Sequence, residues 1–171
     1  MNLIVHDLEN LTFNKIFNFN DRENYIISDN GSIKSCTGCF GCWIKTPGTC
    51  VIKDGYENTG RLFSKADNVL IFSRCYYGGY SPFVKNVLDR SISYLLPFFK
   101  IKNNETHHKQ RYKNKTRLYV YFYGEQVTQD EMETARNLVR ANGINFNVVE
   151  YKVVFTDTAE QAGREVAAQW K

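Results

Sequence analysis

Residues 68–85 read NVLIFSRCYYGGYSPFVK and contain, in order, a strand, a glycine-containing loop and the start of a helix. Asn68–Ser73 is apolar, includes β-branched residues and shows no polar alternation, which predicts a fully buried strand. Ser81 followed by Pro82 is typical of a helix start, because serine caps free backbone N–H groups and proline needs no N–H at the first helical position. A strand that leads through a short loop into a helix is the repeating unit of α/β folds.

The same alternation of strands and helices extends over the rest of the chain. Apolar runs predict further strands at 3–6, 25–27, 118–123 and 146–155. Helices are predicted at 8–19, from Asp54 over Phe63, at 81–95 before Pro97, from the capping box at Thr128 to Gly143, and at 157–170. Such alternation forms parallel sheets with right-handed crossovers. We therefore expect an α/β fold, a flavodoxin-like three-layer sandwich in which helices cover both faces of a five-stranded parallel sheet, with residues 1–171 as a single domain.

Composition excludes several classes of protein. Of the 171 residues, 43% are hydrophobic and 15% are aromatic, which is too many for a disordered chain. The formal net charge of +4 is too small to indicate a nucleic acid or a membrane surface as partner. The apolar runs fall short of the ~20 residues of a membrane-spanning helix, and the N-terminus has no signal-peptide pattern. We expect a cytoplasmic protein.

Residues 98–117 are the most basic part of the chain, with seven Lys or Arg and a single Glu. We expect a solvated excursion between a helix and a strand, with the pair His107-His108 exposed. The alternative is a docking surface for an anionic cofactor such as NAD(P)H or for a second subunit.

The loop after the strand at 68–73 is a candidate ligand site. Glycines allow close approach of a ligand to the backbone, and tyrosines offer flat surfaces with a polar tip. In parallel α/β sheets, ligands bind at the carboxyl ends of the strands, where this loop lies. The loop therefore suits a planar heterocycle, and the alternative is an ordinary strand–helix connection that happens to be aromatic.

Two segments carry a resemblance to known families. SRCYYGGYSPFVKNVLDR (73–90) and CTGCFGCWIKTPGTCVIKDG (36–55) resemble segments of the NAD(P)H-dependent FMN reductase and iron–sulfur flavoprotein families. The resemblance implies FMN as cofactor, with the flavin ring wrapped by Arg74, Cys75, Tyr76, Tyr77, Gly78 and Gly79, closed on the other side by Tyr123 and Gly124, and shielded by the loop 36–50. It also implies NAD(P)H and a small electron acceptor as partners, and a homodimer or higher oligomer.

The first strand departs from the pattern of these families. They hold the FMN phosphate after this strand in a loop rich in Ser, Thr, Arg and Asn, where N–H groups and hydroxyls face the dianion. Residues 5–10 read VHDLEN, with two carboxylates and no Gly, Ser or Arg. We expect Asp7 to cap the following helix and to take the place of the anion, and FMN to bind more weakly than in typical members. Arg74 could supply a replacement contact.

Four cysteines lie within fifteen residues, as Cys36-x2-Cys39-x2-Cys42-x7-Cys50. Three cysteines at such gaps plus a fourth nearby can bind a [4Fe–4S] cluster, and the spacing lies within that of the iron–sulfur flavoproteins. Zinc is a further alternative, although it favours two separated pairs. The third alternative is a set of reduced thiols that shape a loop. For Cys75 we expect a packing role.

The sequence leads to one principal function and two alternatives. The principal one is an FMN-dependent NAD(P)H oxidoreductase of the flavin or quinone reductase type, without a general acid or base, because the flavin supplies the chemistry. The first alternative is an electron-transfer protein that carries both FMN and a [4Fe–4S] cluster. The second is a cofactor-less binding or assembly protein.

Overall fold

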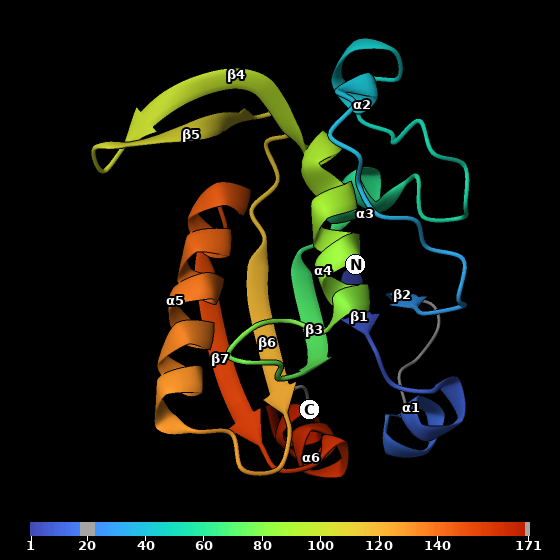
Figure 1. Cartoon of the computed structure of the whole chain (residues 1–171), viewed down its shortest axis with the longest axis vertical. Coiled ribbons are helices and arrows are strands. Elements are labelled where there is room, and N and C mark those ends of the chain that lie inside the picture. Colours follow the sequence, from blue (N-terminus) through green and yellow to red (C-terminus); the bar gives the residue numbers. More distant parts are fainter. Residues whose placement is uncertain (18–22, 170–171) are drawn as a thin grey trace.

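The computed structural model describes residues 1–17 and 23–169, and its centre is a parallel sheet in the order β2-β1-β3-β6-β7 (Figure 1). The strands are β1 (Asn2–His6), β2 (Asn24–Ser28), β3 (Asn68–Arg74), β6 (Arg117–Tyr123) and β7 (Glu150–Thr156). Every neighbouring pair is parallel. The predicted five-stranded parallel sheet is confirmed, and the loops after β1, β3, β6 and β7 share its carboxyl edge.

Helices cover both faces of the sheet, as predicted. The helices on one face are α3 (Thr59–Lys65), α4 (Pro82–Arg90) and α5 (Gln129–Phe146), which pack on side chains such as Val5 and Ile71. The opposite face carries α1 (Asn10–Ile16) and α6 (Ala159–Gln169), which pack on side chains such as Ile4 and Phe72. Because neighbouring residues of a strand point to opposite faces, the buried strands supply both layers of core.

Helix α4 is shorter than the predicted helix at 81–95. It ends at Arg90 and continues as a 3-10 turn, η1 (Ser91–Tyr94), in which the Ser91 hydroxyl donates to the carbonyl of Leu88. Serine side chains that bond backbone carbonyls compete with regular helix. Leu95, the last apolar residue of the predicted helix, instead begins a strand.

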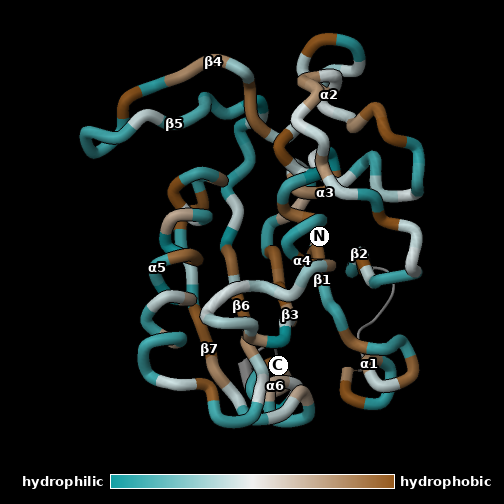
Figure 2. Tube along the Cα trace, viewed as in Figure 1, coloured by the Kyte–Doolittle hydropathy of each residue, from teal (hydrophilic) through white to brown (hydrophobic). Residues whose placement is uncertain are grey.

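The expected excursion between a helix and a strand is a β-hairpin of β4 (Leu95–Lys102) and β5 (Glu105–Gln110), a regular element that was not predicted. Asn103 and Asn104 both have positive φ, as a two-residue hairpin turn requires, and asparagine tolerates that conformation. Figure 2 shows that β4 is largely hydrophobic and β5 largely hydrophilic. His107 is buried and His108 half-buried, so the expected exposure of this pair is wrong.

Helix α5 has the predicted capping box, in which the Thr128 side chain and Glu131 satisfy each other's backbone N–H groups. It does not end at Gly143 but continues to Phe146, and Asn147 terminates it in the left-handed conformation. A Cβ on Gly143 would lie 3.2 Å from the side chain of Val148, so this glycine permits close packing rather than termination.

The remaining boundaries differ modestly from prediction. α3 begins at Thr59 rather than near Asp54. The ends of two predicted helices, at Asn18 and Phe19 and at Trp170, lie outside the described residues. Within the described residues, no helix has both the length and the apolar character that crossing a bilayer requires.

Candidate functional site

The loop between β3 and α4 is fixed by its own backbone and by α5. The Tyr76 N–H donates to the Gly79 carbonyl at 3.0 Å, and the Gly79 N–H donates back to the Tyr76 carbonyl at 2.7 Å. Gly78 has a φ of 77°, and a Cβ there would lie 2.7 Å from the carbonyl oxygen of Glu131 in α5. Glycine is needed at this position both for the left-handed backbone and for the close approach of α5.

The predicted ring-binding tyrosines are accessible at the carboxyl edge of the sheet. The side chains of Tyr76 and Tyr77 are 45% and 90% exposed. The Arg74 guanidinium carbon lies 5.7 Å from the centroid of the Tyr76 ring, within the range of a cation–π contact. Two open rings beside a guanidinium form a surface on which a planar heterocycle can stack.

Tyr123 and Gly124, which were expected to close the other side of the ring, lie beside this loop in the structure. The Cys75 N–H donates to the carbonyl of Tyr123 at 2.9 Å, and the N–H of Gly124 donates to the carbonyl of Thr156 at 3.1 Å. Cys75 is half-buried against the core, and burial raises the pKa of its thiol. A thiol with a raised pKa is a poor nucleophile, which agrees with the packing role expected for this residue.

Asp7 is not the cap of α1, which is a correction to the sequence analysis. The N-cap is Glu9, and its side chain makes no capping hydrogen bond. The Asp7 carboxylate instead accepts the backbone N–H of Arg74 at 2.8 Å and the hydroxyl of Tyr123 at 2.9 Å. Burial, followed by the neighbouring Asp7 charge, raises the pKa of Tyr123 well above its usual range, so its proton remains available to the carboxylate.

The residues after β1 do not fit a phosphate group. A phosphate dianion needs converging N–H and hydroxyl donors, and here the Arg74 backbone N–H and the Tyr123 hydroxyl are already bonded to Asp7. The Arg74 guanidinium, over the Tyr76 ring, is a single cationic group and not a set of converging donors. α1 has only seven residues, and Glu9 at its start adds a second negative charge. Among the described residues, the carboxyl edge therefore offers a surface for a flavin ring but no cradle for its phosphate.

His6 is a buried group at the end of β1. Its side chain is fully buried and stacks on the Phe13 ring with centroids 3.8 Å apart. Among the described residues, neither ring nitrogen makes a hydrogen bond of good geometry. Burial lowers the pKa of His6 to about 4, so the ring is neutral at physiological pH.

The cysteine segment lies at the other end of α4 from the loop at 74–79 (Figure 1). It includes the short helix α2 (Gly41–Ile44), and the indole N–H of Trp43 donates to the carbonyl of Leu95, just beyond η1. α4 spans about 13 Å, given its nine residues and a rise of ~1.5 Å each. Within one chain, the segment 36–50 therefore does not shield the loop that was expected to wrap a flavin ring.

The four thiols of this segment differ in environment. Cys36 and Cys39 are exposed, Cys42 is half-buried and Cys50 is buried. The backbone N–H of Gly41 lowers the pKa of Cys39, whereas burial raises that of Cys42. Over residues 1–17 and 23–169, no group of three or more His, Cys, Asp or Glu side chains is placed to hold a metal ion. The cluster and zinc interpretations find no support in this geometry.

Arg90 holds the cysteine segment to α4, a role that sequence reasoning missed. Its guanidinium donates to both oxygens of Asp54 at 2.7 and 2.9 Å and to the sulfur of Cys50 at 3.1 Å. Further bonds reach the carbonyls of Lys34 and Ile52. The side chains of Arg90 and Asp54 are 0% and 2% exposed. The arginine bond holds the pKa of Asp54 well below its usual range.

Comparison with solved structures identifies the architecture. The NAD(P)H:quinone oxidoreductase from Methanothermobacter marburgensis gives a TM-score of 0.57 at 9% identity, over 100% of this chain and 99% of that chain. The azoreductase AzrA gives 0.56 at 12% identity, over 98% and 97% of the two chains. The FMN-dependent NADH-azoreductase from Bacillus anthracis str. Ames Ancestor, solved with FMN, gives 0.54 at 11% identity, also over 98% and 97%. The fold is flavodoxin-like.

At these identities, the structural likeness establishes the flavodoxin-like fold and carries no residue roles. No protein-family model matches the sequence, and no curated protein matches it either. The function must therefore be argued from the chain's own residues at the carboxyl edge of its sheet.

Proposed function

We propose that the chain is an FMN-dependent NAD(P)H oxidoreductase of the flavin or quinone reductase type that binds its flavin mainly through the ring. The observation that carries the proposal is the pair of accessible rings, Tyr76 and Tyr77, on a loop fixed against α5 and joined to Tyr123. The loop lies where ligands of parallel α/β sheets bind. The azoreductase and quinone oxidoreductase described above have the same fold, and their activities are the best guide to its chemistry.

In this proposal, the protein supplies a surface rather than reacting groups. Tyr76 and Tyr77 provide stacking area, and the turn at Gly78 and Gly79 brings backbone close to the ring edge. NAD(P)H and a small electron acceptor are the proposed partners. Because the described residues of this edge form no phosphate cradle, we expect the phosphate of FMN to add nothing to the binding free energy, and the carboxylates of Asp7 and Glu9 to oppose it.

Titration of the purified full-length chain with FMN and with riboflavin tests the proposal. Riboflavin, which lacks the phosphate, is expected to bind at least as tightly as FMN, and NAD(P)H oxidation is expected to depend on added flavin. Absorbance difference spectra measure the binding. If neither flavin changes its spectrum on addition of the protein, the proposal is wrong and the cofactor-less alternative is favoured.

Replacing Tyr76 with leucine tests the stacking surface. Loss of the ring is expected to weaken the binding of both flavins about threefold to tenfold, because aromatic pairs contribute about 0.5–1.5 kcal/mol beyond area burial. Tyr25→Leu is the matched control, since Tyr25 is 48% exposed on the edge strand β2. If the Tyr76→Leu variant and the wild type bind flavin equally well, the flavin ring does not stack on Tyr76.

We also propose that the chain forms a homodimer or a higher oligomer through the β4–β5 hairpin. Phe98, Phe99 and Ile101 are exposed on β4, and hydrophobic side chains grouped on a projecting hairpin are typical of interfaces. A second copy of the chain is the proposed partner. Light scattering of the wild type is expected to give at least twice the 19.9 kDa of one chain. The double variant Phe98→Ser, Ile101→Ser is expected to give a monomer.

Leu11→Ser, at another exposed apolar residue, is the control for that experiment. A monomeric wild type, or an oligomer that persists in the double variant, would exclude this interface.

A further inference from the structure

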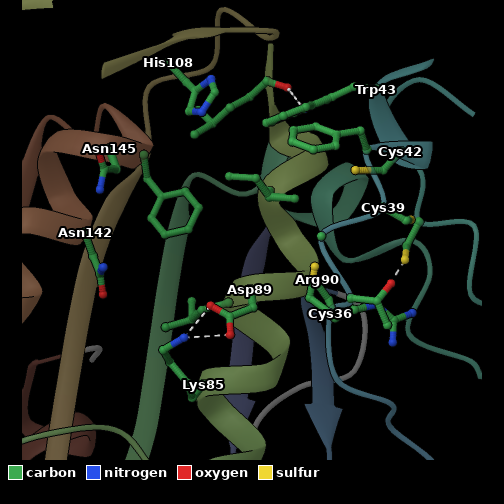
Figure 3. A pocket seen from close by; sticks show the side chains of 18 of the residues that line it. Cys36, Cys39, Cys42, Trp43, Lys85, Asp89, Arg90, His108, Asn142 and Asn145 are labelled. Atoms are coloured by element: carbon green, nitrogen blue, oxygen red, sulfur yellow. Dashed lines mark hydrogen bonds and ion pairs between the residues drawn. The ribbon is translucent and has the colours of Figure 1, made fainter. Parts of the chain in front are cut away.

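A cavity of about 520 Å³ lies between α4 and α5, beneath the β4–β5 hairpin and beside the cysteine segment. We call it the α4–α5 pocket. Figure 3 shows side chains that line it from all four directions, including Lys85 on α4, Asn142 on α5, His108 on β5 and Trp43 in α2. Among the residues that the structure describes, none of Arg74–Gly79 lines this cavity. It shares no residue with the segment proposed to bind flavin, and Tyr80, which directly follows that segment, lies between the two.

The walls of the pocket are mainly apolar and aromatic. Leu88, Ile92, Leu138 and Phe146 line its sides, and Trp43 and His108 lie with ring centroids 5.0 Å apart. The Trp43 indole is fixed by its bond to the Leu95 carbonyl at 3.0 Å. Aromatic walls held in place by hydrogen bonds favour a flat ligand and reduce the entropy that binding costs.

The charged groups of the pocket are already paired. Lys85 and Asp89 form an ion pair with each other, and Arg90 is bonded to Asp54. An ionic ligand would therefore have to displace a partner or enter without a counter-charge, and a charge that is buried unpaired is unfavourable. The pocket favours a neutral ligand.

Two buried polar atoms of the lining have no hydrogen-bond partner among the described residues, namely the hydroxyl of Tyr80 and Oδ1 of Asn142. Tyr80 is 7% exposed, and burial raises the pKa of its phenol, so the hydroxyl remains a donor. Buried polar atoms are almost always paired, because an unpaired one is costly. Both atoms lie just behind the accessible wall of the cavity, so a ligand with a donor and an acceptor would supply the missing partners after a small shift of the neighbouring side chains.

We infer that the α4–α5 pocket binds a neutral, planar aromatic molecule that carries a hydroxyl group, of the phenol class. The rings of Trp43 and Phe146 contact its flat faces, and Tyr80 or Asn142 bonds its polar end. The cavity volume lies within the range of ~300–1,000 Å³ that small-molecule sites occupy.

Calorimetric titration of the full-length chain with three probes tests the inference. 2-Naphthol is neutral and has a hydroxyl, 2-methylnaphthalene lacks the polar group, and 2-naphthoate is an anion. 2-Naphthol is expected to bind at least about tenfold more tightly than either of the others. Absence of 2-naphthol binding, or equal binding of 2-naphthoate, would overturn the inference.

Two variants locate the binding site. Leu138→Trp fills the pocket and is expected to abolish 2-naphthol binding while leaving flavin binding at the carboxyl edge unchanged. The proposal for the pocket and the proposal for the flavin site can therefore be refuted separately. Tyr80→Phe removes only the orphaned hydroxyl and is expected to weaken 2-naphthol about fivefold with no effect on 2-methylnaphthalene. Leu11→Trp and Tyr25→Phe are the matched controls on exposed positions. Unchanged 2-naphthol affinity in both pocket variants would exclude this cavity as the site.

Discussion

Replacing Arg90 with methionine is expected to lower the free energy of unfolding by about 3–5 kcal/mol, because it leaves the carboxylate of Asp54 buried without its partner. Both oxygens of Asp54 accept bonds from this guanidinium, and the Asp54 side chain is 2% exposed. Urea unfolding followed by circular dichroism measures the change in midpoint.

Lys85→Met is the matched control, since Lys85 also pairs with an aspartate, Asp89 on the same helix, but both of these side chains are about half exposed. That variant is expected to lose no more than about 0.5 kcal/mol. The double variant Arg90→Met, Asp54→Leu is expected to recover part of the stability lost in Arg90→Met, because it removes the stranded charge as well. A loss below about 1 kcal/mol in Arg90→Met would mean that the ion pair does not anchor the cysteine segment.

The same pair predicts a dependence of stability on pH. The pKa of Asp54 is lowered in the folded chain, so the unfolded chain binds the proton more readily. The stabilisation is complete above the unfolded pKa of about 3.9 and is lost as the pH falls from there towards the lower folded pKa. Arg90→Met is expected to show a smaller loss of stability over this acid range than the wild type.

Replacing Asp7 with asparagine is expected to tighten FMN binding about tenfold and to leave riboflavin binding nearly unchanged. The amide oxygen can accept the backbone N–H of Arg74, and the amide NH2 can donate to the Tyr123 oxygen, which accepts as well as donates, so both contacts are kept while one negative charge is removed. A unit charge about 12 Å from a phosphate contributes about 1.4 kcal/mol at an effective dielectric constant of ~20, which is a tenfold change in affinity.

Glu105→Gln is the control for that experiment, because Glu105 is an exposed carboxylate on β5. The comparison of the two flavins separates the charge from any change in the ring surface, since only FMN carries the phosphate. Equal gains for FMN and riboflavin in Asp7→Asn would assign the effect to the ring surface instead.

The parts of the fold that local sequence determines could be predicted. The caps at Ser81 and Thr128 satisfy backbone groups within a few residues, so their helix starts are found where the sequence indicates. The buried strand at 68–74 is similarly local, because its composition requires cover on both faces. Together with the alternation of strands and helices along the chain, these elements were sufficient to predict the parallel sheet.

The parts that depend on distant partners could not be predicted. Asp7 bonds Tyr123, which lies 116 residues away, and no local pattern distinguishes this partner from the N–H groups of a helix. Arg90 and Cys50 lie 40 residues apart, and their contact places the cysteine segment at the end of α4 away from the loop at 74–79. The β4–β5 hairpin, by contrast, could have been predicted from local sequence, since Asn103-Asn104 between two strand-like runs is a recognisable turn signal.

The position of Asp7 affects the stability of the folded chain in the absence of a ligand. Sites in which several donors converge on an absent anion are destabilised until that anion binds, and such proteins gain much of their stability from their cofactor. Here the carboxylate of Asp7 serves as an internal counterion for the donors at the sheet edge. The backbone N–H of Arg74 and the hydroxyl of Tyr123 therefore have their hydrogen-bond acceptor in the folded chain without any bound anion.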